Sequence, residues 1–146
     1  MKLLIICAAI YLAKANQNLL IRDDIIQHWD QLLNIYKNEC INESGVKSEM
    51  VINVVELLKL PNDRNYKCFL KCLYERLGLL SNDGIFNLQS MAKKVKAADV
   101  DLVEQTMNLL PEIGDNCEKA YQFALKSAIK VALRYPKLNL NLNLKI

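Results

Sequence analysis

The stretch Cys68-Phe-Leu-Lys-Cys72-Leu-Tyr-Glu-Arg-Leu-Gly78 decides the fold of this chain. Its two cysteines are spaced by one turn of an α-helix, so both sulfurs lie on the same face of that helix. Two thiols stacked in this way are badly placed to bond each other, because their Cβ vectors are parallel. Each cysteine therefore needs a partner elsewhere in the chain, and we expect the covalent cross-links to start from this helix.

The N-terminal residues 1–15 have the pattern of a signal peptide. Lys2 supplies a positive charge, residues 3–12 are an apolar run, and Ala13-Lys-Ala15 has the form of an A-x-A cleavage site. The apolar run is shorter than a bilayer requires, so a membrane anchor is the less favoured alternative. The sequence therefore predicts a secreted, extracellular protein with no stable membrane insertion, whose mature chain begins at Asn16.

Charge and length narrow the class of protein. Removal of Lys2 and Lys14 with the signal peptide lowers the formal charge from +3 to +1, which gives no basis for a nucleic-acid partner. The length of the mature chain suits one domain with a single core. We expect a helical domain over residues 16–135 and a C-terminal tail over residues 136–146.

The mature chain contains four cysteines, Cys40, Cys68, Cys72 and Cys117, because Cys7 leaves with the signal peptide. An even number of cysteines in a secreted chain indicates a disulfide framework. Since the helix geometry makes a bond between Cys68 and Cys72 unfavourable, two pairings remain open.

Glycine and proline residues separate segments of helical periodicity, which predicts an all-α fold. Asn62 or Asp63 is expected to cap the third helix, and Asp99 the fifth. The six predicted helices span approximately residues 24–40, 48–60, 63–77, 88–95, 99–110 and 116–134.

The tail from Leu138 to Leu144 alternates strictly between leucine and asparagine. In an extended conformation it would have one apolar edge. Two interpretations stay open: a mobile tail, or a lid that lies across an opening between helices.

Residue types that carry enzymatic chemistry are scarce. His28 is the only histidine, so neither a histidine metal site nor a Ser/His/Asp triad is predicted. Four cysteines in disulfides leave no thiolate nucleophile. The sequence therefore predicts a non-enzymatic protein without a cofactor or metal, and His28 is expected on a solvated helix surface.

The apolar content is high, with 52% hydrophobic residues, and short helices tied by disulfides can leave a cavity between them. Aromatic and thioether side chains suit a small lipophilic ligand in such a cavity. Periodicity alone does not distinguish a lined cavity from a packed core. The predicted ligand-binding residues are Met50, Val54, Phe69, Leu73, Leu77, Phe86, Met91, Met107, Leu110, Tyr121 and Phe123.

The segment Asn42-Glu-Ser44 is a sequon for N-glycosylation. We expect it to lie in a surface loop, with Asn42 as the candidate acceptor.

The residues from Cys68 to Phe86, which include Cys72-Leu-Tyr-Glu-Arg-Leu-Gly78, resemble insect odorant-binding proteins of the pheromone-binding and general-odorant-binding family. Cys40 lies where the first cysteine of that family is expected, and Gly114-Asp-Asn-Cys-Glu-Lys-Ala-Tyr-Gln-Phe123 is similar to the stretch around the fifth. The resemblance covers nearly the whole mature chain. It implies a six-helix, disulfide-bridged fold that encloses an apolar cavity, and a secreted carrier of odorants, pheromones or other small lipophilic molecules.

The chain departs from that family at two cysteine positions. Members usually have six cysteines, paired first with third, second with fifth and fourth with sixth. Here the fourth falls near residues Thr106 to Asn108 and the sixth at Lys126, and no cysteine stands at either place. The resemblance therefore implies a four-cysteine variant with the bridges Cys40–Cys72 and Cys68–Cys117.

Loss of the third bridge should loosen the attachment of one helix to the fold. The helix predicted over residues 99–110 is then held to the last helix by packing alone. We expect this helix and its flanking loops to form the loosest wall of the cavity.

Other functions compatible with the same scaffold stay open. One is a secreted interaction or effector protein, as in a venom or reproductive fluid, that has a filled core and an exposed tail. A secreted lipid-active enzyme or a membrane-active peptide precursor is less favoured, because a His/Asp pair and a calcium-binding loop are missing. The predicted carrier also leaves room for a contact with a chemoreceptor or with a second copy of the chain.

Overall fold

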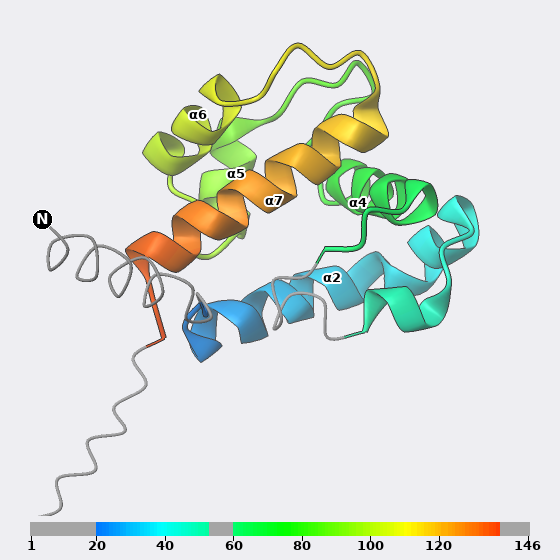
Figure 1. Cartoon of the computed structure of the whole chain (residues 1–146), viewed down its shortest axis with the longest axis horizontal. Helices are drawn as coiled ribbons and strands as arrows, with labels where there is room; N and C mark the ends of the chain where they lie inside the picture. The colour runs from blue at the N-terminus through cyan, green and yellow to red at the C-terminus, as the bar shows by residue number, and fades with distance from the viewer. Residues whose placement is uncertain (1–19, 53–59, 138–146) are drawn as a thin grey trace, which may run out of the picture.

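A computed structural model describes residues 20–52 and 60–137 (Figure 1). These residues form the helices α2 (Asp23–Ser44), η1 (Ser48–Val51), α4 (Arg64–Arg76), α5 (Leu88–Lys94), α6 (Val100–Asn108) and α7 (Asn116–Arg134), of which η1 is a 3-10 helix. In this part of the chain the only strand-like pairings are two isolated bridges. The predicted all-α class is therefore confirmed.

Several predicted features lie outside the described residues. They are the signal peptide over residues 1–15, most of the predicted second helix with Val54, and the alternating tail over residues 138–144. The beginning of the second helix is described, and it forms the short 3-10 helix η1.

Side-chain caps set the starts of the helices. Asp63 and Asp99 each accept a hydrogen bond from the backbone N–H three residues further on, at 2.9 Å and 2.8 Å. Asn87 caps α5 in the same way, and Asp115 caps α7. Each oxygen satisfies an N–H that has no partner within the helix, so the predicted caps at Asp63 and Asp99 are confirmed.

The end of α2 differs from the prediction. The helix continues past Cys40 to Ser44, and Gly45 follows it with a φ of 69° and donates its N–H to the carbonyl of Ile41. This left-handed conformation favours glycine and closes many helices. Gly45 therefore determines where α2 stops, four residues beyond the predicted end at Cys40.

Helix α4 packs against both α2 and α7, and α6 packs against α5 and α7. Figure 1 shows α7 crossing the middle of the molecule, with α5 and α6 on one side and α2 on the other. The main core lies among these helices and contains Phe69 and Leu73 of α4. A smaller cluster, which includes Ile25 and Val131, joins the beginning of α2 to the end of α7.

Candidate functional site

A pocket of about 140 Å³ lies between α2, α4, α5 and α7, and its walls are mostly aliphatic and aromatic. Trp29 and Leu33 line it from α2, and Ala124 and Ala128 line it from α7. The small side chains on α7 leave space that larger residues would fill. A largely apolar pocket of this kind is suited to a small lipophilic molecule.

The structure brings only some of the predicted ligand-binding residues to this pocket. Those that line it are Phe69, Leu77, Met91 and Phe123, and Val54 lies outside the described residues. Those that do not line it are Met50, Leu73, Phe86, Met107, Leu110 and Tyr121, which belong to the core cluster or pack against it.

Core packing explains this separation. Leu73 has no exposed surface, and the ring of Phe86 stacks on that of Phe123 with 4.5 Å between the centroids. Phe86 therefore supports a side chain of the pocket wall without lining the pocket itself. Helical periodicity identified the inward faces, but it could not separate the pocket wall from the layer that packs behind it.

The contribution of α2 to the pocket was not predicted from the sequence. Of the residues in this helix only Ile25 and Cys40 are buried, although the apolar stripe between them includes Trp29, Leu32 and Leu33. These three side chains are half-buried and line the pocket. The apolar periodicity of these residues was the signal in the sequence that could have indicated it.

Polar contacts hold α2 against the connection between α5 and α6. The indole N–H of Trp29 donates to the carbonyl of Lys96, and Nε2 of His28 lies 2.9 Å from the carbonyl of Lys94. His28 therefore lies on a partly exposed surface of α2, as expected, and in addition contacts the end of α5. Because the neighbouring Val95 and Ala98 line the pocket, these contacts fix one edge of its wall.

An ion pair strengthens the same attachment. Nζ of Lys96 lies 2.8 Å from the carboxylate of Asp24, which also pairs with Arg22. Arg22 and then Lys96 hold the pKa of the Asp24 carboxyl well below its usual range. This carboxylate stays charged at physiological pH, although its exposure to solvent limits what the pair contributes.

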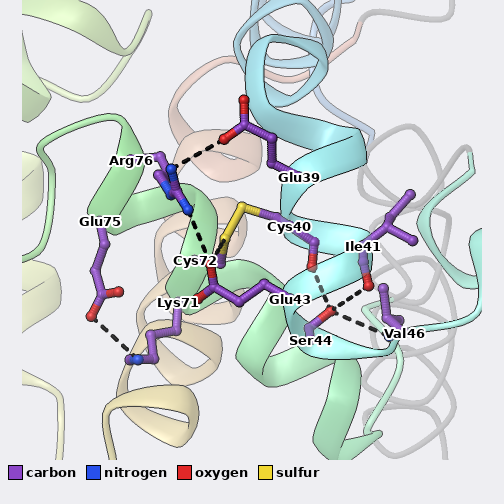
Figure 2. The surroundings of a disulfide bond; sticks show 10 residues. All are labelled: Glu39, Cys40, Ile41, Glu43, Ser44, Val46, Lys71, Cys72, Glu75 and Arg76. Carbon is purple, nitrogen blue, oxygen red and sulfur yellow. Dashed lines mark hydrogen bonds and ion pairs between the residues drawn. A yellow bond between two sulfur atoms is a disulfide. The ribbon is translucent and has the colours of Figure 1, made fainter.

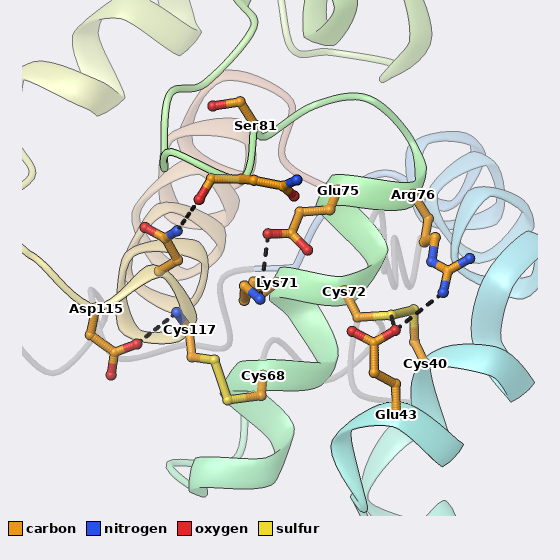
Figure 3. Close-up of polar contacts among 12 residues, drawn as sticks. Cys40, Glu43, Cys68, Lys71, Cys72, Glu75, Arg76, Ser81, Asp115 and Cys117 are labelled. Carbon is orange, nitrogen blue, oxygen red and sulfur yellow. Dashed lines mark hydrogen bonds and ion pairs between the residues drawn. A yellow bond between two sulfur atoms is a disulfide. The ribbon is translucent and has the colours of Figure 1, made fainter.

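Two disulfides start from α4, as Figure 3 shows. Cys72 is bonded to Cys40 of α2 and Cys68 to Cys117 of α7, with Cα–Cα distances of 5.6 Å and 4.5 Å. This is the pairing that the family resemblance implies. Each bridge closes a long stretch of chain and stabilises the fold by about 4 kcal/mol in the chain-entropy model. The bridges attach two walls of the pocket, α2 and α7, to the third.

Charged side chains surround the bridge between Cys40 and Cys72 (Figure 2). The guanidinium of Arg76 pairs with Glu39 at 3.1 Å and with Glu43 at 3.2 Å, which joins α4 to α2 across the disulfide. These groups are about half exposed, so each pair is worth less than about 1 kcal/mol. The disulfide therefore provides most of the local attachment.

The sequon lies in the last turn of α2, so the prediction of a loop was wrong. The helix extends through Asn42 because it ends only at Gly45. Asn42 is exposed, whereas Ser44 donates its hydroxyl to the carbonyl of Cys40 at 2.7 Å.

Ion pairs also flank the second bridge. Arg64 pairs with Asp115, and Nζ of Lys67 lies 2.5 Å from Glu118. The hydrogen bonds from Arg64 and Lys67 lower the pKa of the Asp115 and Glu118 carboxyls, respectively. These pairs join the start of α4 to the start of α7 beside Cys117.

The described residues contain neither a candidate metal site nor a membrane-spanning helix. Among them, no group of His, Cys, Asp or Glu side chains is arranged to hold a metal ion. None of their helices has the length and apolar character needed to cross a bilayer.

Known proteins resemble this chain in sequence and in fold. The sequence profile of the PBP/GOBP family matches residues 25–125. General odorant-binding protein 69a of Drosophila melanogaster is 26% identical, over 76% of this chain and 74% of the relative. General odorant-binding protein 99a of the same organism is 28% identical, over 82% of each chain.

A solved structure shows the same fold. The crystal structure of an odorant binding protein from Locusta migratoria superposes with a TM-score of 0.51 at 19% identity, covering 82% of this chain and 98% of that chain. The family profile spans well over half of the sequence. The chain therefore belongs to the PBP/GOBP family, a family of non-enzymatic carriers that bind small hydrophobic ligands.

Proposed function

We propose that this protein is a secreted carrier that holds a small hydrophobic ligand in the pocket between α2, α4, α5 and α7. The observation that carries the proposal is the pocket of about 140 Å³ with mostly aliphatic and aromatic walls. The mechanism is partition, in which an apolar molecule leaves water for the pocket and is carried through an aqueous fluid. Membership of a family of small-ligand carriers supports it.

The expected affinity follows from the surface that a ligand buries. A ligand that buries about 200–300 Å² at about 25 cal/mol per Å² gains about 5–7 kcal/mol before the entropic cost of binding. We therefore expect micromolar affinity with modest selectivity.

The same proposal includes processing in the secretory pathway. Residues 1–15 would be removed as a signal peptide, and the mature chain would be a four-cysteine variant with both disulfides formed. Asn42 is exposed and is the candidate acceptor for a glycan. Mass spectrometry of the protein secreted from insect cells tests this, and it should find an N-terminus at Asn16 and no free thiol.

Trp29 provides a direct assay of the pocket, because it is the only tryptophan of the chain and lines the cavity. A lipophilic fluorescent probe such as N-phenylnaphthylamine should bind the mature protein and change the emission of Trp29. The substitution Ala128→Phe places a ring where a methyl group lines the pocket, so probe affinity should fall about tenfold or more.

The neighbouring Ile129 supplies a matched control for this experiment. It is 47% exposed and does not line the pocket, so Ile129→Phe adds bulk to α7 without filling the cavity. Its probe affinity should match that of the unsubstituted protein. If no apolar probe binds, or if both variants lose affinity equally, the proposed site is wrong.

A further inference from the structure

The sequon Asn42-Glu-Ser44 lies in the last turn of α2. In an α-helix, residues two positions apart point about 200° away from each other around the axis, so the side chains of Asn42 and Ser44 do not face each other. In an extended chain the same two side chains lie on one face. Because a sequon is recognised through its asparagine and its serine together, the folded helix does not present it as an acceptor.

The hydroxyl of Ser44 is also used by the backbone, as Figure 2 shows. It donates to the carbonyl of Cys40 at 2.7 Å and accepts a hydrogen bond from the N–H of Val46 at 3.2 Å. Ser44 is half-buried, whereas Asn42 is exposed. An enzyme that binds this hydroxyl must first break contacts at the end of the helix, so the exposure of Asn42 does not by itself open the site.

Contacts next to the sequon hold this turn in its helical form. Gly45 donates its N–H to the carbonyl of Ile41 at 2.9 Å, and its own carbonyl accepts from the side-chain amide of Asn65 at 3.2 Å. Val46, which follows, is only 4% exposed and belongs to the main core. Opening of the turn therefore disturbs both the end of α2 and its contact with α4.

The bridge between Cys40 and Cys72 fixes the other side of the sequon to α4. Cys40 lies two residues before Asn42 and is completely buried. Arg76 of α4 pairs with Glu43, the middle residue of the sequon, at 3.2 Å. Once the bridge has formed, local opening of the turn is restricted, because its beginning can no longer move away from α4.

We propose that Asn42 accepts a glycan only while the last turn of α2 is unfolded, and that formation of the Cys40–Cys72 bridge closes the site. Transfer joins Nδ2 of Asn42 to the anomeric carbon of an oligosaccharide and releases one amide proton. The bond from that carbon to a lipid diphosphate breaks, and the diphosphate leaves with the bonding electrons. Glycan occupancy is then set by a competition between transfer and folding.

The inference builds on the acceptor named above and adds when that acceptor is open. Asn42 does not line the pocket, so a glycan there is compatible with a bound ligand. Glycan transfer and probe binding are separate measurements. Failure of this inference therefore leaves the carrier function untouched.

Glycan transfer to the purified mature protein tests the proposal directly. The oxidised, folded protein and the same protein carboxymethylated on its reduced cysteines are each incubated with a eukaryotic oligosaccharyltransferase and a lipid diphosphate oligosaccharide. Carboxymethylation puts charges at the buried Cys40 and Cys72, which keeps the chain unfolded. Mass spectrometry measures the glycan, and Asn42→Gln gives the background.

The unfolded chain should accept at least about tenfold more glycan than the folded protein, because only its sequon can become extended. Equal transfer to the two forms would overturn the proposal. Absence of transfer to either form would overturn it as well, because Asn42 would then not be an acceptor.

A sequon moved to an exposed loop is the matched control. In the Asn42→Gln protein, Glu112→Asn with Gly114→Ser places one in the connection between α6 and α7, where both positions are exposed. A Cβ atom at position 114 would meet no atom within 4 Å, so the fold accommodates it. The folded control should accept glycan within about twofold of its unfolded form. If the folded control is also refused, the helix is not the cause and the proposal is overturned.

Removal of each bridge in turn tests the competition in insect cells that express the full chain. Cys40→Ser with Cys72→Ser should raise the glycosylated fraction about twofold or more, because the turn stays open for longer. Cys68→Ser with Cys117→Ser removes the bridge that does not involve α2 and should raise it less. Cells and medium are measured together, so a variant that fails to fold still gives a result. No increase, or an equal increase in both variants, would overturn the role of the Cys40–Cys72 bridge.

Discussion

At the scale of single residues, Leu73 and Leu77 show how neighbouring positions acquire different roles. They are one helical turn apart on the same sequence pattern, and both were predicted to bind ligand. Leu73 has no exposed surface and does not line the pocket, whereas Leu77 is half-buried and does. The two leucines differ because Leu73 faces the packed core and Leu77 faces the pocket. Helical periodicity does not show which of the two lies opposite a given side chain.

Substitution of these two leucines by alanine should therefore have different effects. Leu73→Ala should lower the free energy of unfolding by about 3 kcal/mol, because it leaves a cavity in the core. Leu77→Ala should cost less stability but weaken probe binding, because it removes part of the pocket wall. Urea denaturation and probe titration measure the two effects. A larger loss of stability in Leu77→Ala, with unchanged probe affinity, would contradict this assignment.

At the scale of helices, α4 and α6 differ in how they are attached to the rest of the fold. Both disulfides start from α4, whereas α6 is held by the buried side chains of Leu102, Val103 and Thr106. Thr106 lies in the stretch 106–108 where the resemblance puts the fourth cysteine, and its hydroxyl donates to the carbonyl of Leu102 at 2.8 Å. Arg134 of α7 pairs with Asp99 at 2.8 Å, but such exposed pairs are weak.

Amide hydrogen exchange of the native protein should reflect this difference. We expect the backbone N–H groups of α6 to exchange faster than those of α4 and α7, because no covalent bridge limits its local opening. Exchange followed by mass spectrometry or NMR can compare the helices directly. If residues 99–110 were among the best-protected segments, the predicted looseness of this wall would be wrong.

Local sequence signals predicted where the helices lie along the chain, but not which helices pack against one another. Asp63, Asp99 and the periodic apolar residues placed α4 and α6, since a cap and a stripe are properties of one segment. The end of α2 was predicted at Cys40, although the helix runs on to Ser44, directly before Gly45. Geometry left two disulfide pairings open, and only the family resemblance distinguished them.

At the scale of the whole molecule, the pocket exists because α2 and α7 are both attached to α4 while small side chains stand on the facing surface of α7. The sequence predicted a cavity and four of its described lining residues, Phe69, Leu77, Met91 and Phe123. It could not show that the stripe of α2 is half-buried, because exposure depends on the distance between helices that are far apart in the sequence.

The most direct test of the carrier account is a crystal structure of the mature protein grown with octanol. The account predicts electron density for the ligand between α2 and α7, in contact with Trp29 and Phe123. Ligand density elsewhere on the molecule, or a pocket filled by its own side chains at saturating ligand, would contradict it.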